Sequence, residues 1–298
     1  MKNKLVLIDG HAIMYRAFHA MPPLSTKSGE PINAVYGLVS MLLKVITDLK
    51  PTHIAVCFDE KEKTFRQKEY KDYQAQRPTM AVELDSQFEK ARDFLKAAKI
   101  SVYSKGGFEA DDVIGTLAKK FGSDVVIVTG DRDILQLIDK DIRLYMPIAG
   151  LSTAKLFGVN ETIERMGVPP KLIPDYKGLV GDPSDNYFGV PRIGPKTAIT
   201  LLNQFETFEG VFKNLDKVPD KLKEKLEKGR ESGFMSYKLA TIVTDVPVKI
   251  DFDAMSKWDL DSSQVLNLFT NEFGFKTLTD RIKKVGKQID EEKQGALF

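Results

Sequence analysis

Three short runs of β-branched and other apolar residues constrain the fold of this chain more than any other feature. They occupy residues 5–8, 53–58 and 125–128, and each is bounded by polar or turn-forming residues. Apolar runs of this length are typical of strands that are buried on both faces of a sheet. Helical patterns lie between them, at 34–49 and 84–99. The alternation predicts an α/β fold with a doubly wound, mostly parallel sheet.

The second half of the chain has a different texture. From about residue 168, closely spaced prolines separate short helical patterns, which continue to about residue 278. We therefore expect an α/β domain over 1–170 and an all-helical domain over 171–282. The polar stretch 283–298 is expected to be a flexible tail.

Composition excludes several classes of protein. The chain has 298 residues, of which 42% are hydrophobic and 29% charged, as in ordinary globular proteins. A single Cys excludes a disulfide framework and any Cys-cluster metal site, and fits a reducing compartment. The first apolar run reaches Asp9 at once, so it is a strand and not a signal peptide. No stretch approaches the length of a membrane span. We expect a cytoplasmic monomer with no membrane association.

Acidic residues follow the ends of the predicted strands. Asp9 follows the first strand, Asp59 the second, and Asp131 and Asp133 the third. In an open α/β sheet the carboxyl ends of neighbouring strands meet at one crevice. We therefore expect these four carboxylates to lie close together.

Two further acidic groups extend this pattern. Glu109, Asp111 and Asp112 open a predicted helix, and Asp182 and Asp185 lie three residues apart. Taken alone, each group has a structural explanation, because acids often cap helices or occupy turns. That explanation weakens when all nine acids are expected to share one crevice.

So many carboxylates in one place require compensation. Two unit charges about 4 Å apart repel by about 4 kcal/mol at an effective dielectric constant of 20. Oxygen ligands without a His or Cys constellation suit Mg²⁺ or Mn²⁺, and two such ions form the usual clamp for hydrolysis at phosphorus. Setting the nine acids aside leaves 33 against 44 Lys and Arg. The remaining surface, at about +11, suits a polyanionic partner.

A basic and aromatic segment follows Asp59. On a helix, Arg66, Tyr70, Tyr73 and Arg77 would form one stripe of alternating cations and rings. That composition is typical of single-strand recognition. The alternative is an amphipathic helix that buries both tyrosines, and these residues alone do not decide between the two.

A glycine-containing turn in the second half precedes another helical pattern. Gly194 permits the turn, and Lys196 and Thr197 begin the helix after it. Exposed N–H groups at a helix N-terminus bind phosphate without reading sequence. The alternative is a simple helix–helix connection.

In their order along the chain, these motifs resemble the bacterial and phage 5′-nuclease (flap endonuclease) family, which includes the 5′→3′ exonuclease domain of DNA polymerase I. The resemblance covers nearly the whole chain. The matching segments are Leu-Ile-Asp9-Gly, Tyr15-Arg-Ala-Phe-His19, Phe58-Asp59, Thr64-Phe-Arg66, Glu109-Ala-Asp-Asp-Val-Ile-Gly-Thr-Leu117, Thr129-Gly-Asp131, Gly181-Asp182, Ser184-Asp-Asn186 and Ser236-Tyr-Lys-Leu-Ala-Thr-Ile242.

The resemblance implies a PIN-like catalytic domain with a helical arch at about 61–99, then a helix–hairpin–helix (H3TH) domain that grips duplex DNA around K⁺. It implies two metal sites. The first is shared by Asp9, Asp59, Glu109, Asp111 and Asp131, and the second lies near Asp133, Asp182 and Asp185, with Asp112 in the shared cluster.

Two positions depart from the family pattern. Gln74 stands where the arch usually has a lysine near the scissile phosphate, and Arg192 takes the place of the first hairpin glycine. We expect Arg66, Arg77 or Lys71 to supply the missing cation as catalytic residues. Arg16, Tyr70 and Tyr73 are expected to contact DNA, together with Gly194, Lys196 and Thr197.

The C-terminus resembles the short peptide by which bacterial replication proteins dock on the sliding clamp. The residues that carry this resemblance are Gln294, Leu297 and Phe298. A frayed chain end is an equally good interpretation. The same feature leads us to expect a complete, stand-alone protein.

These features together predict a Mg²⁺-dependent, structure-specific 5′ nuclease, with 5′→3′ exonuclease and flap endonuclease activity. Its expected substrate is DNA with a 5′ flap, nick or overhang, and RNA–DNA primers are a second one, in replication and repair. Two alternatives stay open. Gln74 and Arg192 motivate a catalytically weak DNA-structure-binding module, and the strand-end acids alone would fit a PIN-type ribonuclease.

Overall fold

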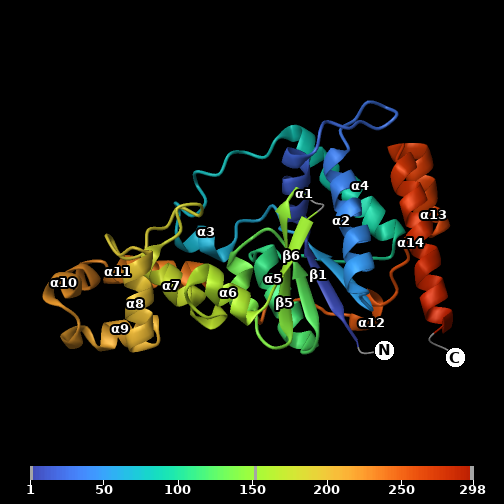
Figure 1. The fold of residues 1–298 in the computed structure, drawn as a ribbon. Helices are drawn as coiled ribbons and strands as arrows, with labels where there is room; N and C mark the ends of the chain where they lie inside the picture. The colour runs from blue at the N-terminus through green and yellow to red at the C-terminus, as the bar shows by residue number, and fades with distance from the viewer. Residues whose placement is uncertain (1–2, 151–152, 296–298) are drawn as a thin grey trace.

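In residues 3–150 and 153–295, which the computed structural model describes, the strands form one six-stranded sheet in the order β3-β2-β1-β4-β5-β6 (Figure 1). The first five strands run parallel to one another, and β6 is antiparallel to β5. The strands are β1 (Leu5–Asp9), β2 (His53–Cys57), β3 (Ser101–Tyr103), β4 (Val125–Val128), β5 (Ile142–Ala149) and β6 (Thr153–Phe157). This confirms the predicted α/β fold with a mostly parallel sheet.

The register of the central strand β1 brings the acidic strand ends together. Asp9 pairs with Cys57 of β2, and Ile8 pairs with Val128 of β4. The residues that follow β2 and β4 therefore leave the sheet beside Asp9. This edge of the sheet positions the acids that the sequence singled out.

Helices cover both faces of the sheet. Val6 and Ile8 pack on the face covered by α1, α2 and α4, whereas Leu5 and Leu7 pack on the face covered by α5. The helical elements of this part are α1 (Gly10–Ala20), α2 (Asn33–Leu49), α3 (Phe65–Glu69), α4 (Val82–Ala97), α5 (Ala110–Phe121), the 3₁₀ helix η1 (Asp133–Leu137) and α6 (Val159–Met166).

A helical part follows and lies at one end of the sheet (Figure 1). Its core continues that of the α5 face, because Leu179 and Phe208 belong to the same buried cluster as Leu5 and Leu7. Its elements are η2 (Pro170–Leu172), α7 (Ile173–Val180), α8 (Pro195–Phe205), α9 (Phe208–Lys213), η3 (Leu215–Lys217), α10 (Asp220–Lys228) and α11 (Arg230–Ala240). A helical C-terminal domain was predicted and is confirmed.

The last helices return to the α/β part, which differs from the expectation that they belong to the helical domain. Val265, Phe269 and Leu278 are buried in the cluster formed with α2 and α4. The elements of this segment are α12 (Phe252–Met255), α13 (Ser263–Asn267), the π-helical turn η4 (Leu268–Phe273) and α14 (Lys276–Gly295). The last helices pack there because α2 and α4 present an apolar face that they cover.

The stretch from residue 283, expected to be a tail, instead continues helix α14 to Gly295. The physical reason is an apolar stripe with helical spacing. Ile282 is fully buried, and Val285 and Ile289 pack against the same cluster. Gln294 lies in this helix, but its side chain, Leu297 and Phe298 lie outside the described residues.

The expected arch helix is also different. Helix α3 ends at Glu69, and Tyr70 and Gln74 leave helical geometry, Gln74 with φ 56°. Arg66, Tyr70, Tyr73 and Arg77 therefore do not form one helical stripe.

Among the described residues, no helix combines the length and apolarity that crossing a membrane would require.

Candidate active site

At the carboxyl ends of β1 and β2, hydrogen bonds connect Asp9 and Asp59 to the starts of two helices. Asp9 caps α1 by accepting a hydrogen bond from the Ala12 N–H at 2.9 Å, and it accepts a second from the Thr129 hydroxyl at 2.8 Å. Asp59 accepts from the Ala110 N–H, at the start of α5, at 2.7 Å. Backbone donors therefore orient both carboxylates.

The third strand end supplies Asp131, and α5 supplies Asp111. The Asp131 N–H donates to the Thr129 hydroxyl at 3.0 Å, which fixes the turn after β4. The carboxylate of Asp111 has no hydrogen-bond partner among the residues that the structure describes. Burial raises its pKa well above the ordinary value, and Asp131 and Asp9 add to that effect. We call Asp9, Asp59, Asp111 and Asp131 the open cluster.

Positive charge is scarce around the open cluster. In the described part of the chain, no lysine or arginine forms an ion pair with its four carboxylates. The imidazole of His11 accepts the Asp59 N–H at 3.0 Å through Nδ1, and burial lowers its pKa. Burial raises the pKa of Asp9 to about 7, and Asp59 and Asp131 act in the same direction. The open cluster therefore favours protons or cations.

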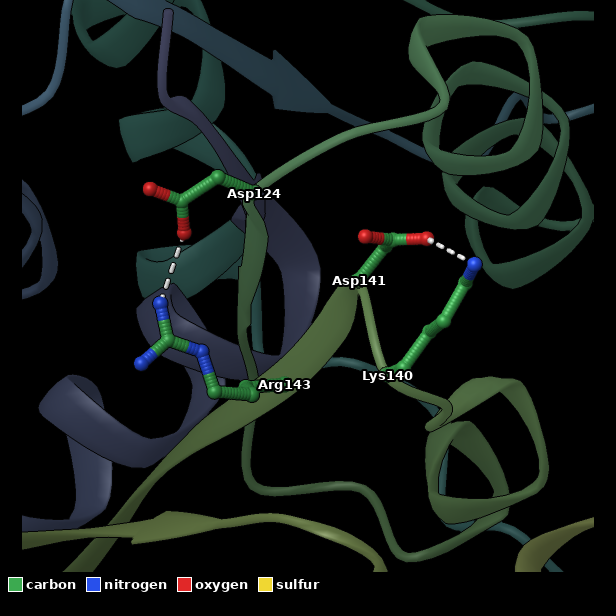
Figure 2. A pocket seen from close by; sticks show the side chains of 4 residues that line it. All are labelled: Asp124, Lys140, Asp141 and Arg143. Atoms are coloured by element: carbon green, nitrogen blue, oxygen red, sulfur yellow. Dashed lines mark hydrogen bonds and ion pairs between the residues drawn. The ribbon is translucent and has the colours of Figure 1, made fainter. Parts of the chain in front are cut away.

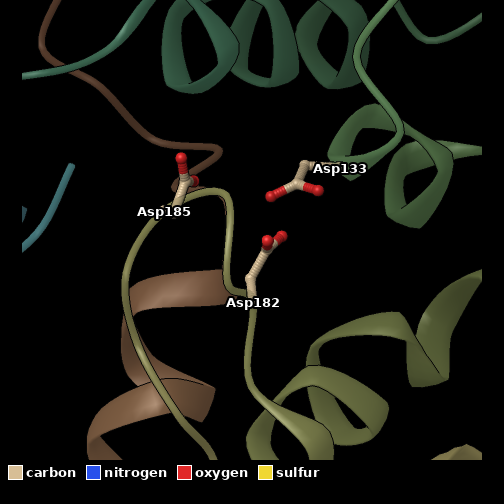
Figure 3. Close-up of side chains that lie close together, drawn as sticks. All are labelled: Asp133, Asp182 and Asp185. Carbon is tan, nitrogen blue, oxygen red and sulfur yellow. The ribbon is translucent and has the colours of Figure 1, made fainter. Parts of the chain in front are cut away.

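A second group of carboxylates lies beside the first. Oxygen atoms of Asp133, Asp182 and Asp185 all lie within 4.8 Å of one another (Figure 3). Asp133 begins η1, and the other two come from the loop after α7. The Asp133 N–H donates to Asp131 Oδ1 at 2.8 Å, which links the two groups. We call these three residues the trio.

The loop that carries Asp182 and Asp185 is closed on itself. Asp182 and Tyr187 exchange backbone hydrogen bonds of 2.7 and 3.1 Å. Gly181 stands before this closure with φ 76°, and a Cβ there would lie 2.4 Å from the Phe188 carbonyl carbon. Glycine is therefore required at this position, and its presence fixes the direction of both carboxylates.

Two cations of the protein compensate the trio. The Lys177 ammonium, 8% exposed, contacts Asp133 and lies 2.6 Å from Asp182, and Arg77 lies 2.6 Å from Asp185. Burial acts to raise the pKa of Asp182, but Lys177 and Ser184 outweigh it and lower the pKa. Burial raises the pKa of Asp133 to about 6 in spite of Lys177.

Sequence reasoning missed Lys177. The residue lies in α7, whose other positions are mostly apolar, five residues before Asp182. A lone lysine in a short apolar helix next to an acidic loop is a weak signal, since most lysines of such helices reach solvent. Its carboxylate partners raise its pKa despite burial, so it is charged.

Asp112 does not join the open cluster, contrary to the prediction. Its side chain is fully buried and receives a two-pronged contact from Arg66, at 2.7 and 2.8 Å, and the Val243 N–H at 2.9 Å. Arg66 is itself 2% exposed and donates to the carbonyls of Leu239 and Thr241. The pair joins α5 to the end of α11.

The expected catalytic role of Arg66 therefore does not fit its position. A guanidinium that is buried with all of these partners has no donor left to offer a phosphate. Glu109 takes the remaining contact, at 3.1 Å from Arg66, and burial raises its pKa to about 7. Glu109 thus contacts Arg66, and the charge of Asp59 in the open cluster adds to the rise of its pKa.

The turn after α3 docks on the trio. The Tyr73 hydroxyl, in a buried side chain, lies 3.3 Å from both Glu109 Oε2 and Asp185 Oδ2. Gln74 donates through its side chain to Asp185 Oδ1 at 3.3 Å, and through its N–H to the Asp185 carbonyl at 3.0 Å. Lys71 is exposed and Tyr70 is half-buried. Gln74 therefore contacts a trio carboxylate.

One predicted DNA contact, Arg16, lies at the border of the site. Arg16 donates to the carbonyls of Ile148 and Gly150, at 3.0 and 2.9 Å, and its guanidinium lies beside Gly130, which precedes Asp131. Arg16 thus fastens the β5 end next to the open cluster.

The predicted turn before α8 contains Gly194, whose φ of −97° is open to any residue. Gly194 is the N-cap of α8, and a Cβ there would meet nothing within 4 Å. Lys196 is exposed, Thr197 is half-buried, and Arg192 adopts φ 65°. The first turn of α8 therefore presents free N–H groups to solvent, as an anion site requires.

A pocket at the opposite ends of the strands differs from the open cluster in its balance of charge (Figure 2). It is lined by Asp124, Lys140, Asp141 and Arg143, around the amino ends of β4 and β5. Arg143 pairs with Asp124 at 2.7 Å. Acids and bases alternate there, so no uncompensated negative charge accumulates.

The donor chemistry of the trio fits a hard divalent cation. Oxygens that bind one Mg²⁺ at about 2.0–2.1 Å lie no more than about 4.2 Å apart, close to the observed 4.8 Å limit. Carboxylate ligands without His or Cys favour Mg²⁺ or Mn²⁺ over Zn²⁺.

Two family models match consecutive parts of the chain. Residues 4–167 match the 5′-3′ exonuclease N-terminal resolvase-like domain, and residues 168–263 match the 5′-3′ exonuclease C-terminal SAM fold. DNA polymerase I of Bacillus subtilis is 39% identical over 295 residues, which are 98% of this chain and 33% of that protein. The enzyme of Caldicellulosiruptor bescii is 39% identical over 284 residues, 94% of this chain and 33% of that protein. The chain thus spans about a third of the length of these relatives.

Solved structures share the fold. The phage T5 flap endonuclease complex with DNA and metal ions superposes with a TM-score of 0.67 at 19% identity, covering 96% of this chain and 100% of that one. The Rad2 catalytic core in complex with DNA substrate gives a TM-score of 0.61 at 16% identity, covering 94% and 91%. A T5 5′-exonuclease structure contains divalent zinc ions. By the two family models, which together match residues 4–263, this chain belongs to the 5′-3′ exonuclease family.

Proposed function

We propose that this chain is a divalent-metal-dependent 5′ nuclease that hydrolyses DNA phosphodiesters, as a 5′→3′ exonuclease and flap endonuclease. The observation that carries the proposal is the 2.8 Å hydrogen bond from the Asp133 N–H to Asp131, which places two carboxylate groups side by side. Two adjacent cation sites are what in-line displacement at phosphorus requires.

The open cluster, with Glu109 at its border, would hold one Mg²⁺ or Mn²⁺, and the trio would hold the other. When bound, such ions lower the pKa of water and stabilise the charge on the attacking and leaving oxygens. Asp112 supports this arrangement from the core, because it holds Arg66 and the first turn of α5.

The residues of the chain contribute charge next to the trio. Lys177 is buried between Asp133 and Asp182, so it can stabilise negative charge that develops at this place. Arg77 has a side chain that is 53% exposed, so it can turn from Asp185 to a phosphate. Lys71 is exposed in the same segment after α3. Arg77 and Lys71 are our candidates for the cation that Gln74 does not supply.

The helical part would hold duplex DNA. The free N–H groups after Gly194, with Lys196 and Thr197, fit a phosphate of the backbone, and K⁺ would bind at the same hairpin. Arg16 and Tyr70 would contact the 5′ strand near the site. A surface that reads backbone tolerates any base, so RNA–DNA primers are proposed as a second substrate.

The names and titles of the related proteins support this proposal. DNA polymerase I acts in DNA synthesis, and the T5 and Rad2 structures contain DNA. We propose primer removal and repair as the role, and a monomeric cytoplasmic protein. We also propose a catalytic part over 1–170 with an arch at about 61–99, and a DNA-binding part within 171–282, whose last helices pack on the catalytic part. Docking of the C-terminal Gln294, Leu297 and Phe298 on a sliding clamp also stays a proposal.

The test is cleavage of a labelled 5′-flap DNA with Mg²⁺, in the parent protein and in Asp131→Asn. We expect cleavage that needs the metal and is lost in Asp131→Asn. Asp141→Asn, at the opposite edge of the sheet, is the matched control and should cleave normally (Figure 2). Binding without turnover in Mg²⁺ and Mn²⁺ would instead identify a binding module, and faster cleavage of a matched RNA flap would identify a ribonuclease.

A further inference from the structure

The hydroxyl of Tyr187 is a buried polar group that lacks a hydrogen-bond partner among the described residues. The residue is 1% exposed, so bulk water does not serve it. Buried polar groups in native proteins are almost always paired, and an unpaired one calls for a bound water or ion as its explanation. Tyr187 therefore points to something that binds next to it.

The surroundings of Tyr187 define the place. Its backbone closes the loop with Asp182, and its ring stacks on that of Tyr73, with centroids 6.3 Å apart and planes 15° from parallel. The charged groups that act on its hydroxyl are Lys177 and the trio, Asp133, Asp182 and Asp185. The hydroxyl is therefore held at the edge of the trio by a rigid backbone and a stacked ring.

The protein groups around this hydroxyl are already engaged with one another. Lys177 donates to Asp133 and Asp182, and Asp182 Oδ1 accepts from the N–H and hydroxyl of Ser184. Asp185 accepts from Arg77, Gln74 and Tyr73. A phenol can both donate and accept, so its natural remaining partner is a water molecule.

Small divalent cations bring such water with them. Mg²⁺ and Mn²⁺ dehydrate reluctantly and keep several waters when carboxylates bind them. Groups that hydrogen-bond to the ligands of a metal orient them and add to its affinity. The trio, its oxygens within 4.8 Å of one another, is the proposed place of the second cation.

We propose that Tyr187 is a positioning residue of the trio's cation, and that its hydroxyl hydrogen-bonds a water molecule which the cation retains. The inference rests on the proposed function only in placing a divalent cation on the trio. It makes two demands that are independent of DNA cleavage. Tyr187→Phe should weaken cation binding at the trio, and it should not destabilise the protein in EDTA, where the hydroxyl has no partner to lose.

The experiment titrates the full chain with Mn²⁺ and follows free Mn²⁺ by electron paramagnetic resonance. We expect two sites in the parent, and a dissociation constant of one site that rises about tenfold in Tyr187→Phe. Asp182→Asn, which removes a proposed ligand, identifies the site that belongs to the trio. Tyr237→Phe is the control, because Tyr237 stacks on Phe208 away from the trio. It should bind Mn²⁺ as the parent does.

Thermal unfolding in EDTA and in Mn²⁺ gives the second readout. Tyr187→Phe should unfold at the same or a higher temperature than the parent in EDTA, and should gain less from Mn²⁺. Unchanged Mn²⁺ affinity at both sites, a single Mn²⁺ in the parent, or a loss of stability in EDTA with normal Mn²⁺ binding would each overturn the proposal. If cleavage fails but the Mn²⁺ results hold, the nuclease proposal falls and this one stands.

Discussion

The open cluster and the trio are built from the same side chain, but they handle its charge in opposite ways. In the open cluster, backbone N–H groups and the Thr129 hydroxyl orient the carboxylates, and burial raises the pKa of Asp9 to about 7. In the trio, Lys177 and Arg77 pair with the carboxylates, and the pKa of Asp182 is lowered. The open cluster has no lysine or arginine partner in the described part of the chain, whereas the trio is paired with two side-chain cations.

The two groups would therefore bind a metal ion against different competitors. At the open cluster a divalent ion competes with protons, so its affinity depends on pH. At the trio it competes with an ammonium and a guanidinium, so its affinity depends on how far Lys177 and Arg77 can move. Arg77 is half-exposed and can leave, whereas Lys177 is buried. Substitutions at these residues therefore test whether the two groups bind metal differently.

The largest effect is expected from Asp111→Asn in the open cluster. Loss of one carboxylate that holds the cation should lower single-turnover cleavage of a 5′ flap by roughly 10³-fold, about 4 kcal/mol of transition-state stabilisation. The unfolding free energy should not fall, since a half-buried carboxylate without a hydrogen-bond partner is removed. Asp112→Asn is the contrast, because it leaves Arg66 with less compensation and should cost stability, by about 3 kcal/mol. Cleavage within tenfold of the parent in Asp111→Asn would remove the open cluster from the mechanism.

Lys177→Met should have the next largest effect, on stability. Without the ammonium, Asp133 and Asp182 are buried together uncompensated, so urea unfolding in EDTA should show a loss of about 3 kcal/mol. Mn²⁺ should restore most of this loss, because the ion takes the place of the ammonium. Lys171→Met, at an exposed lysine of η2, is the control and should change little. A loss that Mn²⁺ leaves untouched would show that Lys177 does not compete with metal.

The pH dependence of stability should reveal the raised pKa of Asp9 in the open cluster. Asp9 in the folded protein holds a proton up to about pH 7, whereas in the unfolded chain it releases it near 3.8. The unfolded state therefore binds fewer protons, and the unfolding free energy in EDTA falls between about pH 4 and 7. Asp9→Asn should flatten this fall and gain about 2 kcal/mol at pH 8. Equal slopes in the parent and Asp9→Asn would show that Asp9 is ionised throughout.

The smallest effect is expected from Gln74→Lys. The new ammonium would lie next to Asp185, where it can reach a phosphate at the trio, and should raise flap cleavage about threefold, or about 0.7 kcal/mol. Gln76→Lys adds the same charge at an exposed position two residues away and is the matched control. Equal gains in both variants would assign the effect to net charge rather than to the trio.

Much of the site could be predicted because it depends on strand ends. A run such as residues 125–128 defines where a buried strand stops, and parallel pairing then brings Asp9, Asp59 and Asp131 to one edge. The positions of the acids at the start of α5 are harder to predict. Asp111 and Asp112 are adjacent in sequence, but successive residues of a helix point about 100° apart. Only the packing of Arg66 decides which of the two faces the core.

The order of strands and helices, and the gathering of acids at the carboxyl ends of the strands, can be predicted from the sequence alone, because both follow from local periodicity. The tertiary structure alone decided which charges meet. Arg77 reaches Asp185 across 108 positions and Arg66 reaches Thr241 across 175. No local pattern encodes such pairs, since their energies arise only when distant segments exclude water together.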